Sequence, residues 1–176
     1  MRVIFVAGVH AVGKSTACQF VSNEFGIPYF TASQIIREER ASAIAENSKL
    51  VADVDGNQKL LLQGVSKRCG VGRLLLDGHF TMRRKTDGEI EAIHIDVFRE
   101  LRIAGVVLFT DHPEQISKRM LERDGATLPT EMFREHQDAE LAHAKFVAES
   151  LKRPMVVLRA FDIDSMSKAV QGWVNV

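Results

Sequence analysis

Gly8-Val9-His10-Ala11-Val12-Gly13-Lys14-Ser15 is the stretch of sequence that decides the fold. It fits the pattern G-x-x-x-x-G-K-[ST] at every fixed position. Residues 3–7 before it form an apolar run typical of a buried strand, and residues 16–21 after it have helical character. Because a strand and a helix flank the glycines in the required order, the pattern predicts a phosphate-binding loop rather than a glycine-rich turn with a solvated lysine.

The predicted loop has a defined chemistry. Its glycines let backbone N–H groups turn inward around anionic oxygens, and the following helix adds the positive end of its dipole. Lys14 is expected to reach the β- and γ-phosphates of ATP, and the Ser15 hydroxyl is expected to ligate Mg²⁺. We assign His10 no part in proton transfer. The predicted nucleotide contacts of this segment are Gly8, His10, Ala11, Val12, Gly13, Lys14, Ser15 and Thr16.

Length and composition indicate one soluble domain. The chain has 176 residues, of which 45% are hydrophobic and 26% are charged, as is ordinary for a globular protein with a sizeable core. Its formal net charge is zero, so no overall basic field attracts nucleic acid or an acidic membrane. Cys18 and Cys69 form no C-x-x-C pair, and no apolar run is long enough to span a membrane. We expect a cytoplasmic protein with nucleotide substrates, and the oligomeric state stays open.

Short apolar runs alternate with long helix-like segments along the chain, an order typical of parallel βαβ units. The runs predicted to be strands are residues 3–7, 26–30, 74–77, 106–109 and 154–158. Helical segments separate them, and a last helix is predicted for residues 165–174. The sequence therefore predicts an α/β fold of the P-loop NTPase type. It would be a three-layer αβα sandwich around a five-stranded parallel sheet, with residues 1–176 as a single domain.

Asp77 ends the third apolar run and is similar to the acidic residue of a Walker-B strand. A carboxylate at the carboxyl end of a parallel strand faces the ligand crevice, where it can hold Mg²⁺ directly or through water. The alternative is a turn or N-cap aspartate before Gly78. We favour the metal role because the phosphate loop already requires a cation. His79 follows at the same crevice and is a candidate for contacting the substrate.

Three arginines are candidates for binding phosphate. Arg119 and Arg123 lie four residues apart on one predicted helix, so both guanidinium groups can converge on one anion. Residues 124–127 then supply a flexible tip, as a closing lid would need. Arg37 lies on the helix after the second strand, where charged neighbours make a salt-bridged solvent face an equal alternative.

Two further segments carry polar or aromatic side chains without a specific motif. His136, Glu140 and His143 share one face of a long predicted helix, but they lack the fourth ligand or the H-E-x-x-H core of a zinc site. A solvated helix face is the better interpretation of these three side chains. Residues 160–163 follow the fifth strand, and they are predicted either to flank a purine base or to turn into the last helix.

Four segments in chain order resemble the nucleoside monophosphate kinases, and among them the adenylate kinases, including the archaeal type. The first is the phosphate loop. Residues 33–38, Ser-Gln-Ile-Ile-Arg-Glu, resemble the G-D-x-L-R-E stretch of that family. Residues 75–78, Leu-Leu-Asp-Gly, together with Arg83, are similar to its L-D-G-F-P-R turn. Residues 111–123 resemble the helix that enters the lid, and Gln58 has a similar counterpart in the archaeal enzymes.

The resemblance implies a role for each matching residue. Arg37 and Arg83 would bind the phosphate of the acceptor, and the other predicted substrate contacts are Gln58 and His79. The two lid arginines would contact ATP and the transferring phosphoryl group. The predicted catalytic residues are Lys14, Asp77, Arg119 and Arg123, with Ser15 and Asp77 as the metal ligands. Residues 31–70 would form the acceptor-binding helices, and residues 114–135 would form a short helical lid.

Together these features predict a phosphotransferase that moves the γ-phosphoryl group of ATP, with Mg²⁺, to a nucleoside monophosphate. A phosphate nucleophile is already anionic, so it requires no general base, and residues 31–33 after the second strand contain no aspartate. Two alternatives stay open. One is a nucleotide-gated P-loop ATPase or switch that docks on a protein or RNA partner. The other is a small-molecule kinase of the shikimate or gluconate type.

Overall fold

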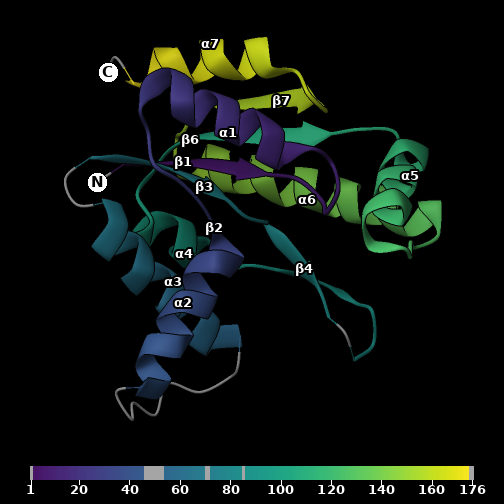
Figure 1. The fold of residues 1–176 in the computed structure, drawn as a ribbon, viewed down its shortest axis with the longest axis horizontal. Helices are drawn as coiled ribbons and strands as arrows, with labels where there is room; N and C mark the ends of the chain where they lie inside the picture. The colour runs from purple at the N-terminus through teal and green to yellow at the C-terminus, as the bar shows by residue number, and fades with distance from the viewer. Residues whose placement is uncertain (1, 46–53, 70–71, 85, 175–176) are drawn as a thin grey trace.

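Five strands form one parallel sheet in the order β2-β3-β1-β6-β7 (Figure 1). The structure is a computed structural model that describes residues 2–45, 54–69, 72–84 and 86–174. The strands of the sheet are β1 Arg2–Ala7, β2 Tyr29–Thr31, β3 Arg73–Asp77, β6 Ile103–Thr110 and β7 Met155–Arg159. The predicted α/β fold with a five-stranded parallel sheet is therefore confirmed.

Helices cover both faces of this sheet (Figure 1). The helices are α1 Lys14–Phe25, α2 Ala32–Ala45, α3 Val54–Cys69, α4 Ile95–Glu100, α5 Pro113–Asp124, α6 Thr130–Ser150 and α7 Ile163–Val174. Buried side chains of α1 and α7 pack in one core cluster, and those of α3, α4 and residues 144–148 of α6 pack in the other. The sheet lies between these two clusters, which is the predicted three-layer sandwich.

The central strand β1 shows why apolar runs mark these strands. Val3, Phe5 and Ala7 belong to one core cluster, whereas Ile4 and Val6 belong to the other. A strand that is covered on both faces needs apolar side chains at every position, so it reads as a continuous run rather than an alternation. Because β1 pairs with both β3 and β6, the loop that follows it lies between the carboxyl ends of its two neighbours.

The backbone of this loop requires the two glycines of the motif, Gly8 and Gly13. Gly8 has φ +136, and a Cβ at this position would lie 2.5 Å from the carbonyl oxygen of Phe109. Gly13 has φ +100 and is the N-cap residue of α1, which begins at Lys14. A side chain is strained at positive φ of this kind. The positive φ at Gly8 and Gly13 therefore favours glycine at both positions, and the close approach of Gly8 to β6 excludes a side chain there.

One supersecondary element lies outside the predicted strands. β4 Thr81–Arg83 and β5 Ile90–Ala92 form an antiparallel hairpin after β3. Each strand has three residues, which is too short for a reliable alternating pattern. In Figure 1 the hairpin projects from the sheet on the same side as α2 and α5. It is an element that no strand signal in residues 80–100 indicated.

The helix α6 spans 21 residues and packs along one stripe. Its buried side chains include Phe133, Ala144 and Ala148, as the spacing predicts. Its remaining faces carry many charged residues. Among the described residues, no helix is both long enough and apolar enough to cross a membrane.

Candidate functional site

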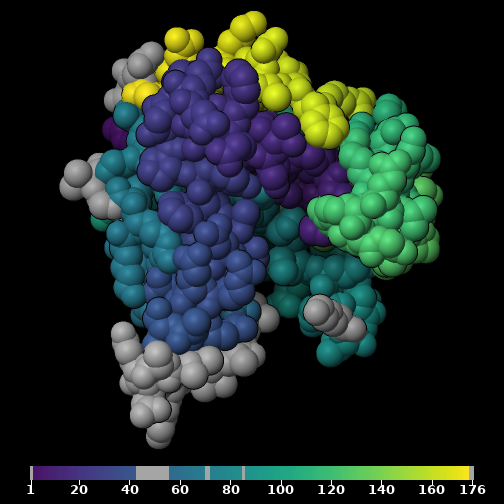
Figure 2. All heavy atoms as spheres, viewed as in Figure 1, coloured from purple at the N-terminus to yellow at the C-terminus, as the bar shows by residue number. Residues whose placement is uncertain are grey.

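A cleft of about 470 Å³ opens at the carboxyl end of the sheet. The space-filling view shows the surface hollowed between α2, in blue, and α5, in green (Figure 2). Residues from the loop, α2, the end of β3, α5 and the segment after β7 line the cleft. They are His10, Ala11, Val12, Gly13, Lys14, Ser15, Thr16, Thr31, Ala32, Ser33, Asp77, Gly78, His79, Arg119, Arg123 and Phe161.

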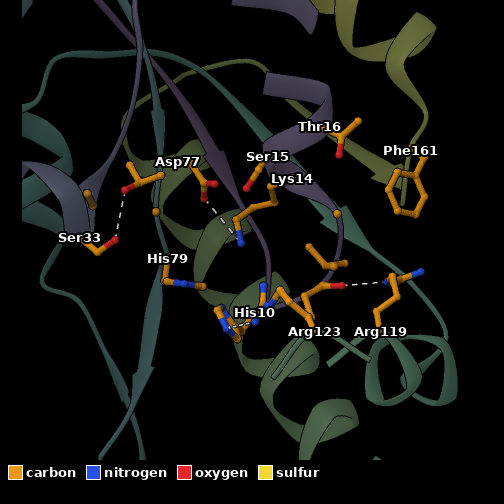
Figure 3. Close-up of a pocket in the computed structure, with 16 residues that line it drawn as sticks. His10, Lys14, Ser15, Thr16, Ser33, Asp77, His79, Arg119, Arg123 and Phe161 are labelled. Atoms are coloured by element: carbon orange, nitrogen blue, oxygen red, sulfur yellow. Dashed lines mark hydrogen bonds and ion pairs between the residues drawn. The ribbon is translucent and has the colours of Figure 1, made fainter. Parts of the chain in front are cut away.

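Lys14 lies at the centre of this cleft (Figure 3). Its Nζ donates hydrogen bonds to the carbonyl oxygens of Gly8 at 2.7 Å and Val9 at 3.2 Å. It also lies 3.6 Å from Oδ1 of Asp77. The ammonium group is thus held by the loop itself and by one carboxylate, in a position from which it can exchange these partners for phosphate oxygens.

Asp77 ends β3 and is 8% exposed. Its Oδ2 accepts a hydrogen bond of 3.3 Å from the Tyr29 hydroxyl, which also interacts with the side chain of Ser15. Burial raises the pKa of Asp77, and the nearby Lys14 charge opposes that rise. Burial and the Asp77 charge also raise the pKa of Tyr29, so its hydroxyl stays protonated and donates. The carboxylate and the Ser15 hydroxyl therefore share one neighbour in the cleft.

Arg119 joins α5 to the loop, as Figure 3 shows. Its Nε donates to the carbonyl oxygen of Ala11 at 2.9 Å, and its Nη2 lies 2.6 Å from Oδ2 of Asp111. Gln137 of α6 holds the backbone of Asp111 by two hydrogen bonds, one donated and one accepted, each of 2.9 Å. The guanidinium also lies over the ring of Phe161, 5.4 Å from its centre. Arg119 is thus fixed against the loop from three sides.

Arg123 lies one turn later on the same helix and also lines the cleft. It is hydrogen-bonded to the ring of His10 and to Asp124, and its side chain is 49% exposed. His10 Nε2 lies 3.7 Å from the Asp124 carboxylate. Burial lowers the pKa of His10, and the charge of Arg123 lowers it further. Both α5 arginines therefore contact the loop, Arg119 at Ala11 and Arg123 at His10, and their convergence on one anion stays a prediction.

Three predicted substrate contacts lie outside the residues that line this cleft. Arg37 is exposed on α2, one turn after Ser33, and Gln58 lies partly buried on α3. Arg83 donates to the carbonyl oxygens of Gly88 at 2.7 Å and Met132 at 3.2 Å. Its guanidinium is therefore engaged between the hairpin and α6. Residues 46–53 and 70 of the predicted acceptor-binding segment lie outside the described residues.

His79 is the one predicted substrate contact of the acceptor side that lines the cleft. Figure 3 places it below Lys14, between Ser33 and His10. Burial lowers the pKa of His79, and the charge of Lys14 lowers it further, so the imidazole is neutral near pH 7. Ser33 and Thr31 form the neighbouring wall, and their hydroxyl oxygens are 3.1 Å apart. These hydroxyls and this imidazole are uncharged donors and acceptors.

The interpretation of Glu140 as part of a solvated helix face is wrong. Its side chain is 1% exposed, because this face of α6 packs against the turn between β3 and β4. His143 on the same face is hydrogen-bonded to the carbonyl oxygen of Ile93 through Nε2, at 2.7 Å. Residue spacing identifies a shared helix face, but it cannot say which other element covers that face.

Tyr29, Thr31 and Ser33 at the site are absent from the predicted contacts. Thr31 had a local signal, since its Oγ1 accepts the backbone N–H of Gln34 at 3.0 Å as an N-cap. Tyr29 had none, because its role depends on the pairing of β2 with β3. Phe161 lies in the segment 160–163, which was predicted either to flank a purine base or to turn into the last helix. It has φ +64 and faces the cleft beside Gly13.

Comparison with known proteins agrees with this geometry. A family model described as AAA domain matches residues 7–136. That span runs from the end of β1 into α6, so it includes the loop, Asp77, Arg119 and Arg123. It covers about three quarters of the chain and every strand except most of β1 and all of β7.

Three curated relatives are nucleotide kinases by name. Adenylate kinase of Bartonella tribocorum is 23% identical over 186 residues, which cover 100% of this chain and 94% of that protein. Human adenylate kinase isoenzyme 5 is 26% identical over 74% of this chain and 24% of its own length. Arabidopsis thaliana UMP-CMP kinase 3 is 26% identical over 69% of this chain and 61% of its own length. The predicted resemblance to nucleoside monophosphate kinases is confirmed as a distant one.

Solved structures share the fold at lower identity. A gluconokinase from Sinorhizobium meliloti 1021 has a TM-score of 0.57 and 13% identity, over 99% of this chain and 91% of that one. An uncharacterized protein from Eubacterium ventriosum ATCC 27560 has a TM-score of 0.52 and 9% identity, over 99% and 98% of the two chains. At these identities the likeness shows a common fold alone.

Proposed function

The chain belongs to the AAA domain family of P-loop proteins, and we propose that it is an ATP-dependent phosphotransferase. In this proposal the γ-phosphoryl group of ATP moves to the phosphate of a nucleoside monophosphate. The observation that carries it is the meeting of Lys14 with Arg119 and Arg123, which come from a different element, in one cleft. In this proposal the two arginines add positive charge at the phosphate end of the nucleotide, beyond what the loop alone supplies.

On the donor side, three positive side chains would neutralise the charge that develops on the transferring group. Lys14 would exchange the carbonyl oxygens of the loop for phosphate oxygens. Arg119 would keep its bond to Asp111 while its other nitrogens turn to phosphate. Phosphoryl transfer asks little covalent chemistry of the protein, so alignment and charge neutralisation are the main contributions. Phe161, beside Arg119, offers an aromatic face on which the base of ATP can stack.

Ser15 and Asp77 have the donor chemistry that Mg²⁺ prefers. Magnesium takes hard oxygen ligands, usually one or two from protein and the rest from water and phosphate. The Tyr29 hydroxyl interacts with both side chains, which indicates that a single ion between loop and β3 could contact the two. When bound, Mg²⁺ would supply charge neutralisation at the phosphates. Ser15 and Asp77 would hold and orient the ion. Without the ion, the Lys14 ammonium group, 3.6 Å from Asp77, offsets the negative charge of this buried carboxylate.

On the acceptor side, Ser33 and His79 would lie next to the attacking oxygen. A phosphate oxygen is anionic at neutral pH, so neither residue has to remove a proton. Arg37 lies one helical turn beyond Ser33, and it would bind the acceptor phosphate after α2 moves toward the cleft. Such closure also excludes water from the transferring group, which keeps transfer ahead of hydrolysis.

One observation favours a second candidate, a kinase that acts on a hydroxyl group. The described wall next to Lys14 on the acceptor side consists of Thr31, Ser33 and His79, which are neutral, while Arg37 and Arg83 lie outside the cleft lining. A neutral polar wall suits a sugar or polyol at least as well as a phosphate. The choice between acceptors therefore depends on whether Arg37 reaches the bound substrate.

The test is a coupled assay of ADP formation with ATP, Mg²⁺ and a panel of acceptors. The panel contains the nucleoside monophosphates, a set of sugar acids and polyols, and a blank without acceptor. Rapid ADP formation with one or more monophosphates, and little in the blank, supports the proposal. Turnover with hydroxyl acceptors alone would instead establish the second candidate. Slow hydrolysis that no acceptor accelerates would contradict both, and it would favour a nucleotide-gated switch. A Lys14→Ala preparation controls for contaminating kinases.

A further inference from the structure

Glu140 of α6 is a buried carboxylate that reaches the turn between β3 and β4. Its Oε1 accepts the backbone N–H of Phe80 at 2.8 Å. Its Oε2 accepts both the backbone N–H of Thr81 at 2.7 Å and the Thr81 hydroxyl at 2.6 Å. The side chain is 1% exposed, so these three donors replace the water that a carboxylate would otherwise bind.

A buried charge of this kind is costly unless its lone pairs are satisfied. Short charge-assisted hydrogen bonds are the strong class of such contacts. Here all three go to two adjacent residues, Phe80 and Thr81, about 60 positions earlier in the chain. The carboxylate therefore fixes one short segment of backbone rather than being spread over a network.

The fixed segment is the one that carries His79. On its other side, the N–H of Gly78 donates to the carbonyl oxygen of Val6 at 2.9 Å. A Cβ at Gly78 would lie 2.8 Å from the ring of Phe5. The turn is thus held by β1 before His79 and by Glu140 after it, and the residue between the two supports projects into the cleft.

The His79 ring also faces Glu140 directly. Its Nδ1 lies 3.8 Å from Oε1 of Glu140. In the part of the chain that the structure describes, this nitrogen is buried without a hydrogen-bond partner. One edge of the ring therefore faces the carboxylate, and the ring also interacts with the backbone of Gly8 in the loop. The position of the ring depends on Glu140 through the backbone and through this contact.

We propose that Glu140 is a positioning residue that holds His79 at the acceptor side of the phosphoryl-transfer site. The inference rests on the proposed phosphotransferase function and names how its acceptor is oriented. Without the carboxylate, the turn would lose three hydrogen bonds, and the ring would no longer be held between Ser33 and His10. The donor side would keep its contacts, because Lys14 and Arg119 are held by the loop and by Asp111.

The principal variant is Glu140→Gln, which keeps the size of the side chain and removes its charge. The NH₂ group of the glutamine is a donor, and it would face a backbone N–H that donates to a carboxylate oxygen in the original protein. At least one backbone hydrogen bond to Phe80 or Thr81 would therefore be lost. We expect the acceptor KM to rise about tenfold, with the KM for ATP within about twofold of the original, since displacement of a positioning group acts on the substrate it touches. Thr81→Val, which removes only the hydroxyl bond, is the second variant should Glu140→Gln fail to fold.

The matched control is Val147→Ala, two turns further along α6 on a fully buried position. It weakens the packing of the same helix and removes none of the three hydrogen bonds that Glu140 accepts from Phe80 and Thr81. We expect a lower Tm and unchanged KM values. A merely structural role for Glu140 would make both variants behave alike.

A readout that does not need turnover accompanies the kinetics. Ring resonances of His79, assigned with a His79→Gln variant, and hydrogen exchange at the Phe80 and Thr81 amides are measured by NMR. We expect Glu140→Gln to shift the ring resonances and speed both exchanges, and Val147→Ala to leave the ring resonances in place. Unchanged ring resonances in Glu140→Gln, or changes equal to those in Val147→Ala, would overturn the proposal. If the original protein transfers phosphate to no acceptor, the proposed function fails and the NMR comparison alone decides the positioning role.

Discussion

Two halves of the cleft hold their polar side chains in different ways. The donor half consists of loop residues 8–15 with α5. The acceptor half consists of the start of α2 and His79, and α3 and the β4–β5 hairpin belong to its surroundings outside the cleft lining. In the donor half Lys14, Arg119 and Arg123 all contact the loop. In the acceptor half Arg37 is exposed on α2, and Arg83 is bound to Gly88 and Met132.

Under the proposed function, we infer that the donor arginines are in place before any ligand binds, whereas Arg37 reaches the acceptor phosphate only after closure. A preformed site avoids the cost of ordering side chains when the ligand arrives. A site that forms on binding can make closure depend on the correct acceptor, which limits transfer to water. Each prediction below tests one side of this comparison.

The largest effect is expected from Lys14→Ala in the donor half. The substitution removes the central positive charge of the cleft, and loss of one such preorganised group costs about 10²- to 10³-fold in turnover. We expect kcat/KM for ATP to fall by about 10³-fold with the fold retained, as measured by the coupled assay and by circular dichroism. Unchanged turnover would refute the assignment of the phosphate loop.

Arg119→Ala is expected to cost about 10²-fold in kcat. Arg119 is held by both Ala11 and Asp111, so its charge is fixed where the phosphates would lie. Arg119→Lys is the matched control, because it keeps the charge but loses the planar fork. We expect it to recover only part of the activity. Arg123→Ala, at a half-exposed side chain, should cost less, and an equal loss would remove the distinction between fixed and exposed lid arginines.

A third prediction concerns the stability of the acceptor half. Glu39 is 7% exposed and joins α2 to α3 through Lys67 at 2.6 Å and Arg68 at 2.7 Å. Glu39→Gln is expected to lower the free energy of unfolding by about 2 kcal/mol, the usual scale for hydrogen bonds to a charged group. Glu38 pairs with the same Arg68, but its carboxylate is exposed, so Glu38→Gln should have a much smaller effect. Urea denaturation measures both.

The same ion pairs predict the direction of a pH effect. The hydrogen bond from Lys67, together with Arg68, lowers the pKa of Glu39 below its ordinary value of 4.5. A carboxylate with a lowered pKa in the folded state stabilises the protein above that ordinary value, and the contribution is lost as the pH falls further. We expect stability to decline between about pH 5 and about pH 3, and the decline to be shallower in Glu39→Gln. An identical decline in the two proteins would exclude Glu39 as its source.

The smallest effect is expected from Arg37→Ala. If Arg37 reaches the acceptor phosphate only after closure, its loss should raise the acceptor KM about tenfold and leave the KM for ATP nearly unchanged. Arg84→Ala is the control, since Arg84 is an exposed arginine of the hairpin that pairs with Asp87. Equal losses for both ligands in Arg37→Ala would contradict the separation into a donor half and an acceptor half.

Sequence patterns predicted the strands of the parallel sheet better than the short hairpin. The strand before Gly8 and the helix after Gly13 follow from an apolar run and from backbone that only glycine adopts without strain. The hairpin after β3 was not predicted, because three-residue strands leave no periodic signal. Arg83 matched a family motif, yet its partners Gly88 and Met132 were not readable from that motif.

Local sequence was sufficient to predict the phosphate loop and the five strand segments of the parallel sheet, because both depend on contiguous residues with marked conformational preferences. Long-range packing sets the rest. Glu140 is buried only because α6 lies across the turn at Phe80 and Thr81, and a helical period cannot indicate which residues it will meet. Likewise, Arg119 acquires its place from Ala11, 108 residues earlier. The phosphate-loop chemistry of the donor site is therefore determined by one contiguous segment. The positions of the side chains around it result from contacts between segments that are distant in the sequence.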